Sequence, residues 1–478
     1  MKQVLDWSKP YHRFFEEMAR IPHGSCHEKQ YSDYLCDFAR ERNLAYRQYE
    51  IGNVIIYKDA SPGYEDHPAV VLQSHMDMVC EKVPESGHDF EQDPLDLYIE
   101  NGWLHARGTT LGADDGTGVA YMLSILNDRY LQHPPLECVF TVQEEVGLGG
   151  AFALNPEDLT GRRFISLDDG GGGAVTTITS AGGMKWNGIF DIHRKHHGGN
   201  GYQLVIGGLQ GGHSGECIDQ EKGNAIKICV RILKELQRAG KITLSCFQGG
   251  SKDNAIPRDC QAEFAADMDD EAVKRIVQNA ASLIREEYRY SDFGLNVAVL
   301  ETITGDIWEQ EESDRFLDFL FLCPNGMRHR SMKIEGLTTA SENLAVVRTG
   351  ESRAEVTVSL RAAAGSYLEE MAEELRIISG IYDITASESA RYPAWGYEEN
   401  SHMREVMKQA VSTVMGKELE LLAVHGGLEC GVFKHKWPDM DMVTLGPVGL
   451  DVHSPDERLD LQSFDECYDL LTEFLRRL

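Results

Sequence analysis

The most constraining feature of this 478-residue chain is an apolar segment that ends abruptly in chemically active side chains. Residues 69–74, AVVLQS, favour a buried strand because the run is short, largely apolar and rich in valine. His75-Met76-Asp77 follows it directly. Because side chains alternate between the two faces of a strand, His75 and Asp77 point the same way. Both can therefore reach one point just beyond the end of the strand.

The same arrangement recurs along the chain. LECVFTVQ (136–143) runs straight into two glutamates, and RRFISL (162–167) runs straight into two aspartates. Two further polar groups open a helix and follow a short C-terminal strand. In an open α/β sheet, ligands bind outside the carboxyl ends of the strands. We therefore predict one site there, formed by residues from the set His75, Asp77, Asp114, Asp115, Glu144, Glu145, Asp168, Asp169 and His453.

Alternating helix and strand patterns predict the fold class of this part of the chain. Residues 28–42 and 114–127 have helical patterns, and the strand-like segments 53–58, 69–74 and 136–143 lie between or after them. Such alternation is typical of an α/β fold. We predict a mostly parallel sheet with helices on both faces.

The length and the change in composition predict two domains. A chain of 478 residues is too long for one ordinary core. Glycine-rich sequence at 170–183 marks a boundary, after which new strand and helix patterns begin. The last stretch returns to the first type. We predict a discontinuous domain formed by residues 1–182 and 394–478, with an α+β domain, residues 183–393, inserted into it.

Composition excludes several classes of partner. The chain has 77 acidic and 46 basic residues, a net charge of −31, so a nucleic-acid backbone would be repelled. No stretch approaches the roughly 18 apolar residues of a membrane span. The 11 cysteines are scattered and form no CxxC pair, which indicates free thiols in a reducing compartment. We expect a cytoplasmic protein that binds neither nucleic acid nor membrane.

So many carboxylates at one edge of a sheet need a positive counterpart. Few lysines or arginines stand beside them in the sequence, so divalent metal is the more economical answer. Histidine and carboxylate ligands without thiolate suit zinc, with cobalt or manganese as alternative occupants. The number of ligands suits two ions that share a bridging carboxylate. One residue of the Glu144-Glu145 pair can then bind metal while its neighbour serves as a general base.

These residues are also the ones that carry a family resemblance. The chain resembles the di-zinc exopeptidases of the aminoacylase and carboxypeptidase type, and within them the Xaa-His dipeptidases, also called aminoacyl-histidine or β-alanyl-histidine dipeptidases. The matching motifs run from residue 75 to residue 459 and therefore cover essentially the whole chain. They are HMDMVCEK, HDFEQDPL, GTTLGADDGTG, QEEVGLGGA, GLQGGHSGECI, HGGLECG and HSPDERL.

The resemblance implies a metal ligand set. His75 and Asp168 would bind one zinc ion, Glu145 and His453 would bind the other, and Asp114 would bridge the two. The sequence departs from the family after Asp168, where Asp169-Gly170 replaces a small residue followed by glutamate. Asp169 therefore competes with Asp168 as the ligand.

The resemblance also implies catalytic and substrate-binding roles. Asp77 would orient His75, Glu144 would be the general base and acid, and His213 would stabilise the oxyanion from an inserted lid domain. In many relatives an equivalent domain mediates dimerisation, so a homodimer is a further expectation. The substrate-facing positions would be Asn254, Arg361, His425, Gly426 and Glu429.

The function implied is hydrolysis of short peptides with a free amino terminus, such as Xaa-His dipeptides. An N-acyl amino acid deacylase or a carboxypeptidase on the same metals is an alternative within the hydrolases. A catalytically silent metal- or peptide-binding protein is the alternative of another class. The intact Glu144-Glu145 pair argues against the silent protein, because the base has no other evident purpose.

Overall fold

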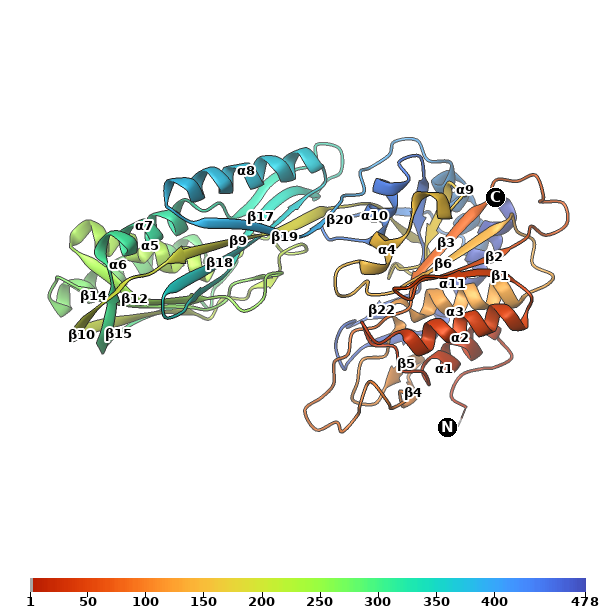
Figure 1. The fold of residues 1–478 in the computed structure, drawn as a ribbon, viewed down its shortest axis with the longest axis horizontal. Coiled ribbons are helices and arrows are strands. Elements are labelled where there is room, and N and C mark those ends of the chain that lie inside the picture. Colours follow the sequence, from red (N-terminus) through yellow and green to blue (C-terminus); the bar gives the residue numbers. More distant parts are fainter. Residues whose placement is uncertain (1–2) are drawn as a thin grey trace. The chain divides into compact units, whose positions relative to one another are not determined.

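The computed structural model describes residues 3–478 and divides the chain into two compact units (Figure 1). Unit 1 comprises the residues up to Thr179 together with Trp395–Ala423 and Leu428–Leu478. Unit 2 comprises Ser180–Ala394 and the short stretch Val424–Gly427. The sequence patterns predicted that the chain passes between the two domains after residues 182 and 393, close to the observed passages after Thr179 and Ala394. They did not predict its return to unit 2 at Val424.

A six-stranded mixed sheet lies at the centre of unit 1. Its strands, in spatial order, are β1 (Ala45–Gln48), β2 (Val54–Lys58), β6 (Leu136–Thr141), β3 (Val70–His75), β7 (Arg163–Ser166) and β21 (Asp441–Thr444). The last four are parallel to one another, whereas β2 is antiparallel to both β1 and β6. The carboxyl ends of β6, β3 and β7 therefore meet at one edge of the sheet.

Helices cover both faces of this sheet, which confirms the predicted fold class (Figure 1). One face carries α1 (Pro10–Met18), α2 (Lys29–Glu41), α3 (Ala113–Asn127), α9 (His402–Val414) and α11 (Leu461–Arg477). The other carries α10 (Glu429–Lys436), whose Phe433 ring lies 4.7 Å from that of Phe164, together with α4 (Gly149–Ala153). The helices predicted at 28–42 and 114–127 are α2 and α3.

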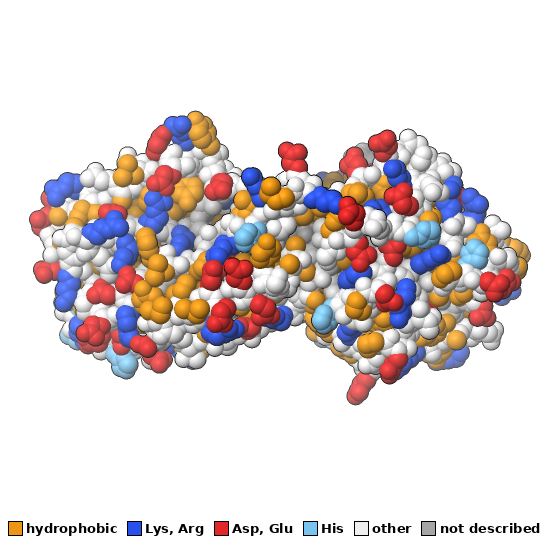
Figure 2. Space-filling view, turned by 90° about the horizontal axis from the view of Figure 1, so that it is seen from above, with side chains coloured by type: hydrophobic (Ala, Val, Ile, Leu, Met, Phe, Trp, Pro, Cys, Tyr) orange, Lys and Arg blue, Asp and Glu red, His pale blue; other side chains and the backbone are white. Residues whose placement is uncertain are grey.

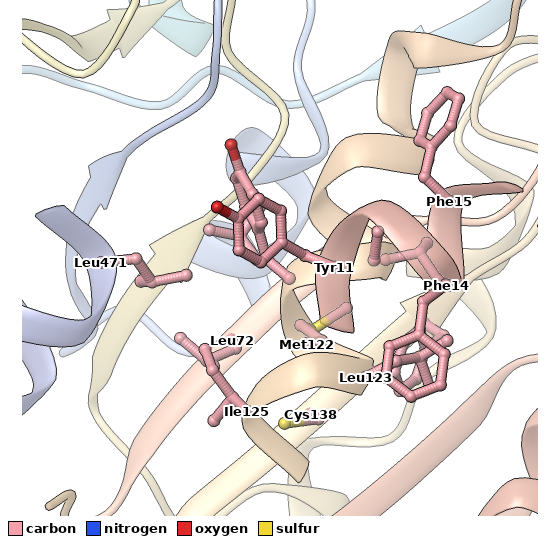
Figure 3. Close-up of a cluster of buried hydrophobic side chains, with 14 of the residues drawn as sticks. Tyr11, Phe14, Phe15, Leu72, Met122, Leu123, Ile125, Cys138 and Leu471 are labelled. Atoms are coloured by element: carbon pink, nitrogen blue, oxygen red, sulfur yellow. The ribbon is translucent and has the colours of Figure 1, made fainter. Parts of the chain in front are cut away.

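The main core of unit 1 lies between the sheet and the helices of the first face. Helix α3 is apolar and buried nearly all round because it is enclosed by the sheet and by other helices. Figure 3 shows this packing. The labelled side chains come from α1, β3, α3, β6 and α11; they are Tyr11, Phe14, Phe15, Leu72, Met122, Leu123, Ile125, Cys138 and Leu471. The packing fixes the start of α3 against the end of β3.

Smaller elements complete unit 1. A four-stranded sheet has the order β22 (Gly449–Leu450), β23 (Arg458–Asp460), β5 (Trp103–Ala106) and β4 (Leu97–Glu100). The loop between β22 and β23 carries His453. In addition, β8 (Val175–Ser180) pairs with β20 (Glu420–Val424), and a short 3-10 turn spans Pro156–Asp158.

Unit 2 is built on a nine-stranded antiparallel sheet with its helices on one face (Figure 1). The strands follow the order β15 (Asn296–Trp308), β10 (Arg194–Gly207), β14 (Cys260–Ala266), β12 (Ile242–Gly249), β17 (Thr338–Thr349), β18 (Arg353–Ala362), β9 (Gly182–Asp191) and β19 (Thr385–Tyr392), and β16 (Gly326–Arg330) pairs with β17. The helices are α5 (Ala225–Ala239), α6 (Asp270–Glu287), α7 (Gln310–Leu322) and α8 (Gly365–Ile381). A separate two-stranded antiparallel sheet pairs β11 (Gly212–His213) with β13 (Ala255–Ile256).

Charged side chains of both signs lie on the surface of the protein. On the face shown in Figure 2, acidic and basic side chains are interspersed over both units. Within residues 3–478, none of the helices combines the length and the apolar character that crossing a membrane requires.

Candidate functional site

Three neighbouring parallel strands of unit 1 each end in predicted site residues. His75 is the last residue of β3, the pair Glu144-Glu145 follows β6, and Asp168 follows β7. Because β3 lies between β6 and β7, these side chains gather at one edge of the sheet.

Two further segments bring their residues to the same edge. Asp114 lies at the start of α3, and its Oδ1 is 2.9 Å from Nε2 of His75. His453 comes from the loop between β22 and β23, with its Nε2 3.3 Å from Oδ2 of Asp114 and 2.9 Å from Oε1 of Glu145. Asp114 therefore contacts both histidines at once, through different oxygens.

The side chains form groups with the spacing of a metal centre. Three sets each offer ligand atoms within 4.8 Å of one another: His75, Asp114 and Asp168; Asp114, Glu145 and His453; and His75, Glu144 and Glu145. The first two sets share Asp114, which is the arrangement expected of a bridging carboxylate between two ions. Imidazole and carboxylate donors without thiolate fit zinc, cobalt or manganese.

The electrostatics of the protein without metal show why this edge needs positive charge. Burial and the neighbouring carboxylates raise the pKa of Glu144 and of Asp168 well above the ordinary value. Hydrogen bonds to Asp114 and Glu145 raise the pKa of His453 to about 11. Burial would lower the pKa of His75, but its bonds to Asp114 and Asp77 raise it well above its ordinary value. Without metal, the two histidines are therefore the cations that offset the carboxylates, a role that divalent ions can take over.

Asp77 fixes the relative positions of two of these strand ends. Nδ1 of His75 lies 3.0 Å from the carbonyl oxygen of Asp77 and 3.6 Å from its carboxylate. The same carboxylate accepts the backbone N–H groups of Glu144 at 3.0 Å and Glu145 at 3.3 Å. Ser25, which the sequence patterns did not single out, donates to it at 2.8 Å. Asp77 therefore connects β3 to the glutamate pair after β6.

The structure separates the roles of Asp168 and Asp169. The Asp168 carboxylate is the one grouped with His75 and Asp114. Asp169 accepts hydrogen bonds from the Thr177 hydroxyl at 3.0 Å, from the Gly171 N–H at 2.7 Å and from the Thr444 hydroxyl. Its oxygens hold the turn after β7, so this geometry favours Asp168 as the ligand.

A pocket of about 150 Å³ opens beside the cluster within unit 1. Acidic and small residues line it, among them Asp114, Asp168, Gly170, Pro447 and Val452. Space next to Asp114 and Asp168 is what ions or a reacting group would require.

Glu429 is not where a substrate contact was expected. It is buried, 2% exposed, inside unit 1 at the start of α10. Its carboxylate accepts hydrogen bonds from Gln73 at 2.6 Å and from the Thr141 hydroxyl at 2.7 Å, which lie on β3 and β6. Burial raises the pKa of Glu429 to about 7. The chain passes from unit 2 to unit 1 within the HGGLE stretch, so His425 belongs to unit 2 whereas Glu429 belongs to unit 1 and contacts β3 and β6 there.

Unit 2 holds a second group of predicted residues around Arg361. Ser341, Arg361, Gly183 and Tyr392 lie in one row across four adjacent strands. The Arg361 guanidinium donates to the Tyr392 hydroxyl at 3.1 Å, and its Nε has no partner in the part of the chain that the structure describes. Among residues 3–478, no carboxylate pairs with Arg361, although only 8% of this residue is exposed. A buried cation in that state is suited to bind an anionic group.

His425 lies beside this row. Its Nε2 is 2.7 Å from the Ser341 hydroxyl. Burial and the charge of Arg361 lower the pKa of His425 to about 3, so the imidazole is neutral at pH 7. Gly426 follows with open space where a side chain would be.

The two-stranded sheet of β11 and β13 brings His213 and Asn254 together. His213 pairs with Ala255, and the Ser214 N–H donates to the Asn254 carbonyl at 2.8 Å. A methyl group on Gly215 would lie 2.8 Å from the His425 carbonyl and 3.1 Å from Cε1 of His213, so these residues are close neighbours within unit 2. His213, Asn254, Arg361 and His425 therefore lie in one region of unit 2, and their roles toward a substrate stay predictions.

A family pattern and two relatives match nearly the whole chain. The sequence pattern of "Peptidase family M20/M25/M40" matches residues 71–477. The chain belongs to this family. The match includes the metal-ligand candidates from His75 to His453, so it covers the site as well as the fold.

Two relatives are similar over nearly their whole length. The chain is 32% identical over 475 residues to the cytosol non-specific dipeptidase of Escherichia coli (strain K12), covering 98% of both chains. It is also 32% identical to the aminoacylhistidine dipeptidase of Vibrio alginolyticus, whose crystal structure matches with a TM-score of 0.86 over 98% of this chain and 96% of that one. The aminopeptidase PepT of Bacillus cereus, at 16% identity and a TM-score of 0.58, shares the fold.

Proposed function

We propose that this protein is a metal-dependent dipeptidase that hydrolyses short peptides with a free amino terminus, such as Xaa-His dipeptides. The observation that carries the proposal is the convergence of four side chains around Asp114, with Glu144 beside them. The four are His75, Glu145, Asp168 and His453. The relatives that share the whole chain length are both named as dipeptidases.

The residues present suit two divalent ions, with zinc favoured. His75 and Asp168 would hold one, Glu145 and His453 the other, and Asp114 both. Two ions so held supply a water of lowered pKa and polarise the scissile carbonyl. Their ligands come from five separate segments, so each must be fixed by its own contacts.

Glu144 is the proposed general base and acid. It belongs to the group with His75 and Glu145, and its backbone N–H is tied to Asp77, so its carboxylate is held at the cluster. It would take a proton from the attacking water and deliver it to the leaving amine nitrogen. Glu145, one residue on, faces His453 instead.

Unit 2 supplies the proposed contacts to the peptide. Arg361, with Tyr392, would bind the substrate carboxylate through charge-assisted hydrogen bonds. His213 would donate to the oxyanion, and His425, Asn254 and Gly426 would contact the peptide. Glu429 is omitted from this set because it is buried under the strand ends.

Replacement of Glu144 by glutamine tests the role of the base. Glu144→Gln should bind zinc with the wild-type stoichiometry but lose about 10²- to 10⁴-fold in kcat, the usual contribution of a positioned acid–base group. Glu81→Gln, an exposed glutamate in the loop after β3, is the control and should keep wild-type turnover. Retained turnover in zinc-loaded Glu144→Gln would reject this assignment.

A substrate panel separates the alternatives. The panel is β-Ala-His, Gly-His, Leu-Gly, a tripeptide and an N-acetyl amino acid. Turnover of the dipeptides supports the proposal; turnover of the N-acetyl amino acid alone would indicate a deacylase, and none at all would indicate a silent binding protein. The name of the E. coli relative supports the expected cytoplasmic location, and the homodimer stays a prediction.

A further inference from the structure

Glu457 makes an unusual set of contacts with the segment that carries Asp114. Its Oε2 accepts the backbone N–H groups of Leu111 at 2.7 Å and Gly112 at 3.1 Å, and its Oε1 accepts that of Ala113 at 2.9 Å. The residue is 2% exposed. One carboxylate thus binds three consecutive backbone donors immediately before a proposed bridging ligand.

The same residue is tied to the loop that carries His453. The Glu457 N–H donates to the Ser454 carbonyl at 3.1 Å, and the Ser454 hydroxyl donates to the Asp451 carbonyl at 2.7 Å. His453 itself has a φ of +61°, a conformation uncommon for a residue with a side chain. Local contacts must therefore hold this loop in shape.

Two ligand-bearing segments, far apart in the sequence, are thus connected by one side chain. Asp114 lies at the start of α3 and His453 follows β22, yet their side chains must meet within 3.3 Å. The Leu111–Asp114 turn also requires a left-handed Gly112, whose φ is +68°. The central sheet reaches the Asp114 segment through Ser74 on β3, whose hydroxyl donates to the Asp115 carbonyl at 2.9 Å, whereas the loop that carries His453 lies outside that sheet.

We infer that Glu457 is a positioning residue of the metal centre: it sets the distance between Asp114 and His453 by clamping the turn before one to the loop after the other. This inference rests on the proposed function. The carboxylate is essential to the clamp, because both of its oxygens accept backbone N–H groups. A glutamine amide, however it is turned, would direct an NH₂ group at one or more of those donors.

Glu137 provides a matched control in the same unit. It is 5% exposed, and its oxygens accept the N–H groups of Thr160 at 3.0 Å and Gly161 at 3.0 Å together with the Thr160 hydroxyl at 2.7 Å. It lies near the start of β6, at the opposite end of that strand from Glu144. Glu137→Gln therefore removes a similar buried carboxylate that contacts neither the segment of Asp114 nor the loop of His453.

The experiment measures zinc dissociation constants by competition with a chromophoric chelator, and unfolding of the chelator-treated protein in urea. Glu457→Gln should weaken zinc binding about 10- to 100-fold, the usual effect of losing a group that orients metal ligands. Glu137→Gln should lose stability in urea but keep the wild-type zinc constant. Glu457→Asp retains the charge on a shorter side chain and should fall between the wild type and Glu457→Gln.

A wild-type zinc constant in Glu457→Gln, or an equal loss in Glu137→Gln, would overturn the inference. If Glu457→Gln does not fold, Glu457→Asp is compared with Glu137→Gln by the same two measurements, and an unchanged zinc constant in Glu457→Asp would overturn it. A wild type that binds zinc and loses affinity in Glu457→Gln, but hydrolyses no peptide, would reject the proposed function alone. A wild type that binds no divalent metal would reject both.

Discussion

Arg361→Met tests the binding of the peptide carboxylate separately from the stability of the protein. The guanidinium is buried and donates to the Tyr392 hydroxyl at 3.1 Å, and within residues 3–478 its Nε has no hydrogen-bond partner. We expect the variant to bind peptide worse and yet to be at least as stable as the wild type. Function and stability would then move in opposite directions at one residue.

The expected magnitudes follow from these contacts. An unsatisfied buried donor costs about 1–3 kcal/mol, and the lost hydrogen bond to Tyr392 contributes about 0.5–1.5 kcal/mol. The free energy of unfolding should therefore stay constant or rise by about 1 kcal/mol. Charge-assisted hydrogen bonds to a peptide carboxylate contribute about 2–3 kcal/mol, so KM should rise about 30- to 150-fold.

The assay compares a dipeptide with its carboxamide, together with urea unfolding. The rise in KM should appear with the free carboxylate and nearly vanish with the carboxamide. Arg328→Met is the control, because Arg328 pairs with the buried Glu342 at 2.9 Å and with Glu374 at 2.8 Å. It should be destabilising by about 3–5 kcal/mol, since it leaves a buried carboxylate unpaired. An unchanged KM for the dipeptide, or a marked loss of stability in Arg361→Met, would refute the reasoning.

Two further substitutions test other parts of the account. In Asp77→Asn, one of the backbone N–H groups of Glu144 and Glu145 must lose its acceptor. Zinc binding, measured by competition with a chelator, should therefore weaken about 10- to 100-fold. Asp158, a buried capping residue elsewhere in unit 1, provides the control, and Asp158→Asn should leave zinc binding unchanged. Equal zinc constants in wild type and Asp77→Asn would contradict this. The pKa of His425 is about 3 in the folded protein and 6.5 in the unfolded chain. As the pH falls from 6.5 towards 3, the unfolded state therefore binds a proton that the folded state does not, and the free energy of unfolding falls in that window. Between pH 7 and pH 4.5, the free energy of unfolding in urea should therefore fall by about 2 kcal/mol less in His425→Gln than in the wild type. Parallel pH profiles of the two proteins would count against a buried neutral imidazole.

The sequence predicted most of the cluster of histidines and carboxylates because its signals are local. A strand that ends in His75 and Asp77, and others that end in Glu144-Glu145 and Asp168, indicate one sheet edge without knowledge of the strand order. The choice between Asp168 and Asp169 was not predictable in this way. It depends on Thr444, which lies on β21 and is brought beside Asp169 only by the folded sheet.

Other features depend on pairings between distant segments. Glu457 lies in the HSPDERL motif, but its partners are backbone groups at 111–113, which carry no sequence signal. The row of Ser341, Arg361 and Tyr392 requires the register of four strands. The resemblance placed Glu429 with His425 among the substrate-facing positions of the HGGLE stretch, yet the chain crosses from one unit to the other between them. Likewise, periodicity predicted β2 as a strand but not its antiparallel pairing with β6.

Metal removal and rescue test the central claim most directly. The protein is dialysed against a chelator, and turnover of β-Ala-His, Gly-His and Leu-Gly is measured before and after addition of zinc, cobalt or manganese. Because His75, Asp114, Glu145, Asp168 and His453 form ligand groups that share one carboxylate, we predict loss of turnover on chelation and recovery with about two ions per chain. Full turnover in the metal-free protein would contradict the account.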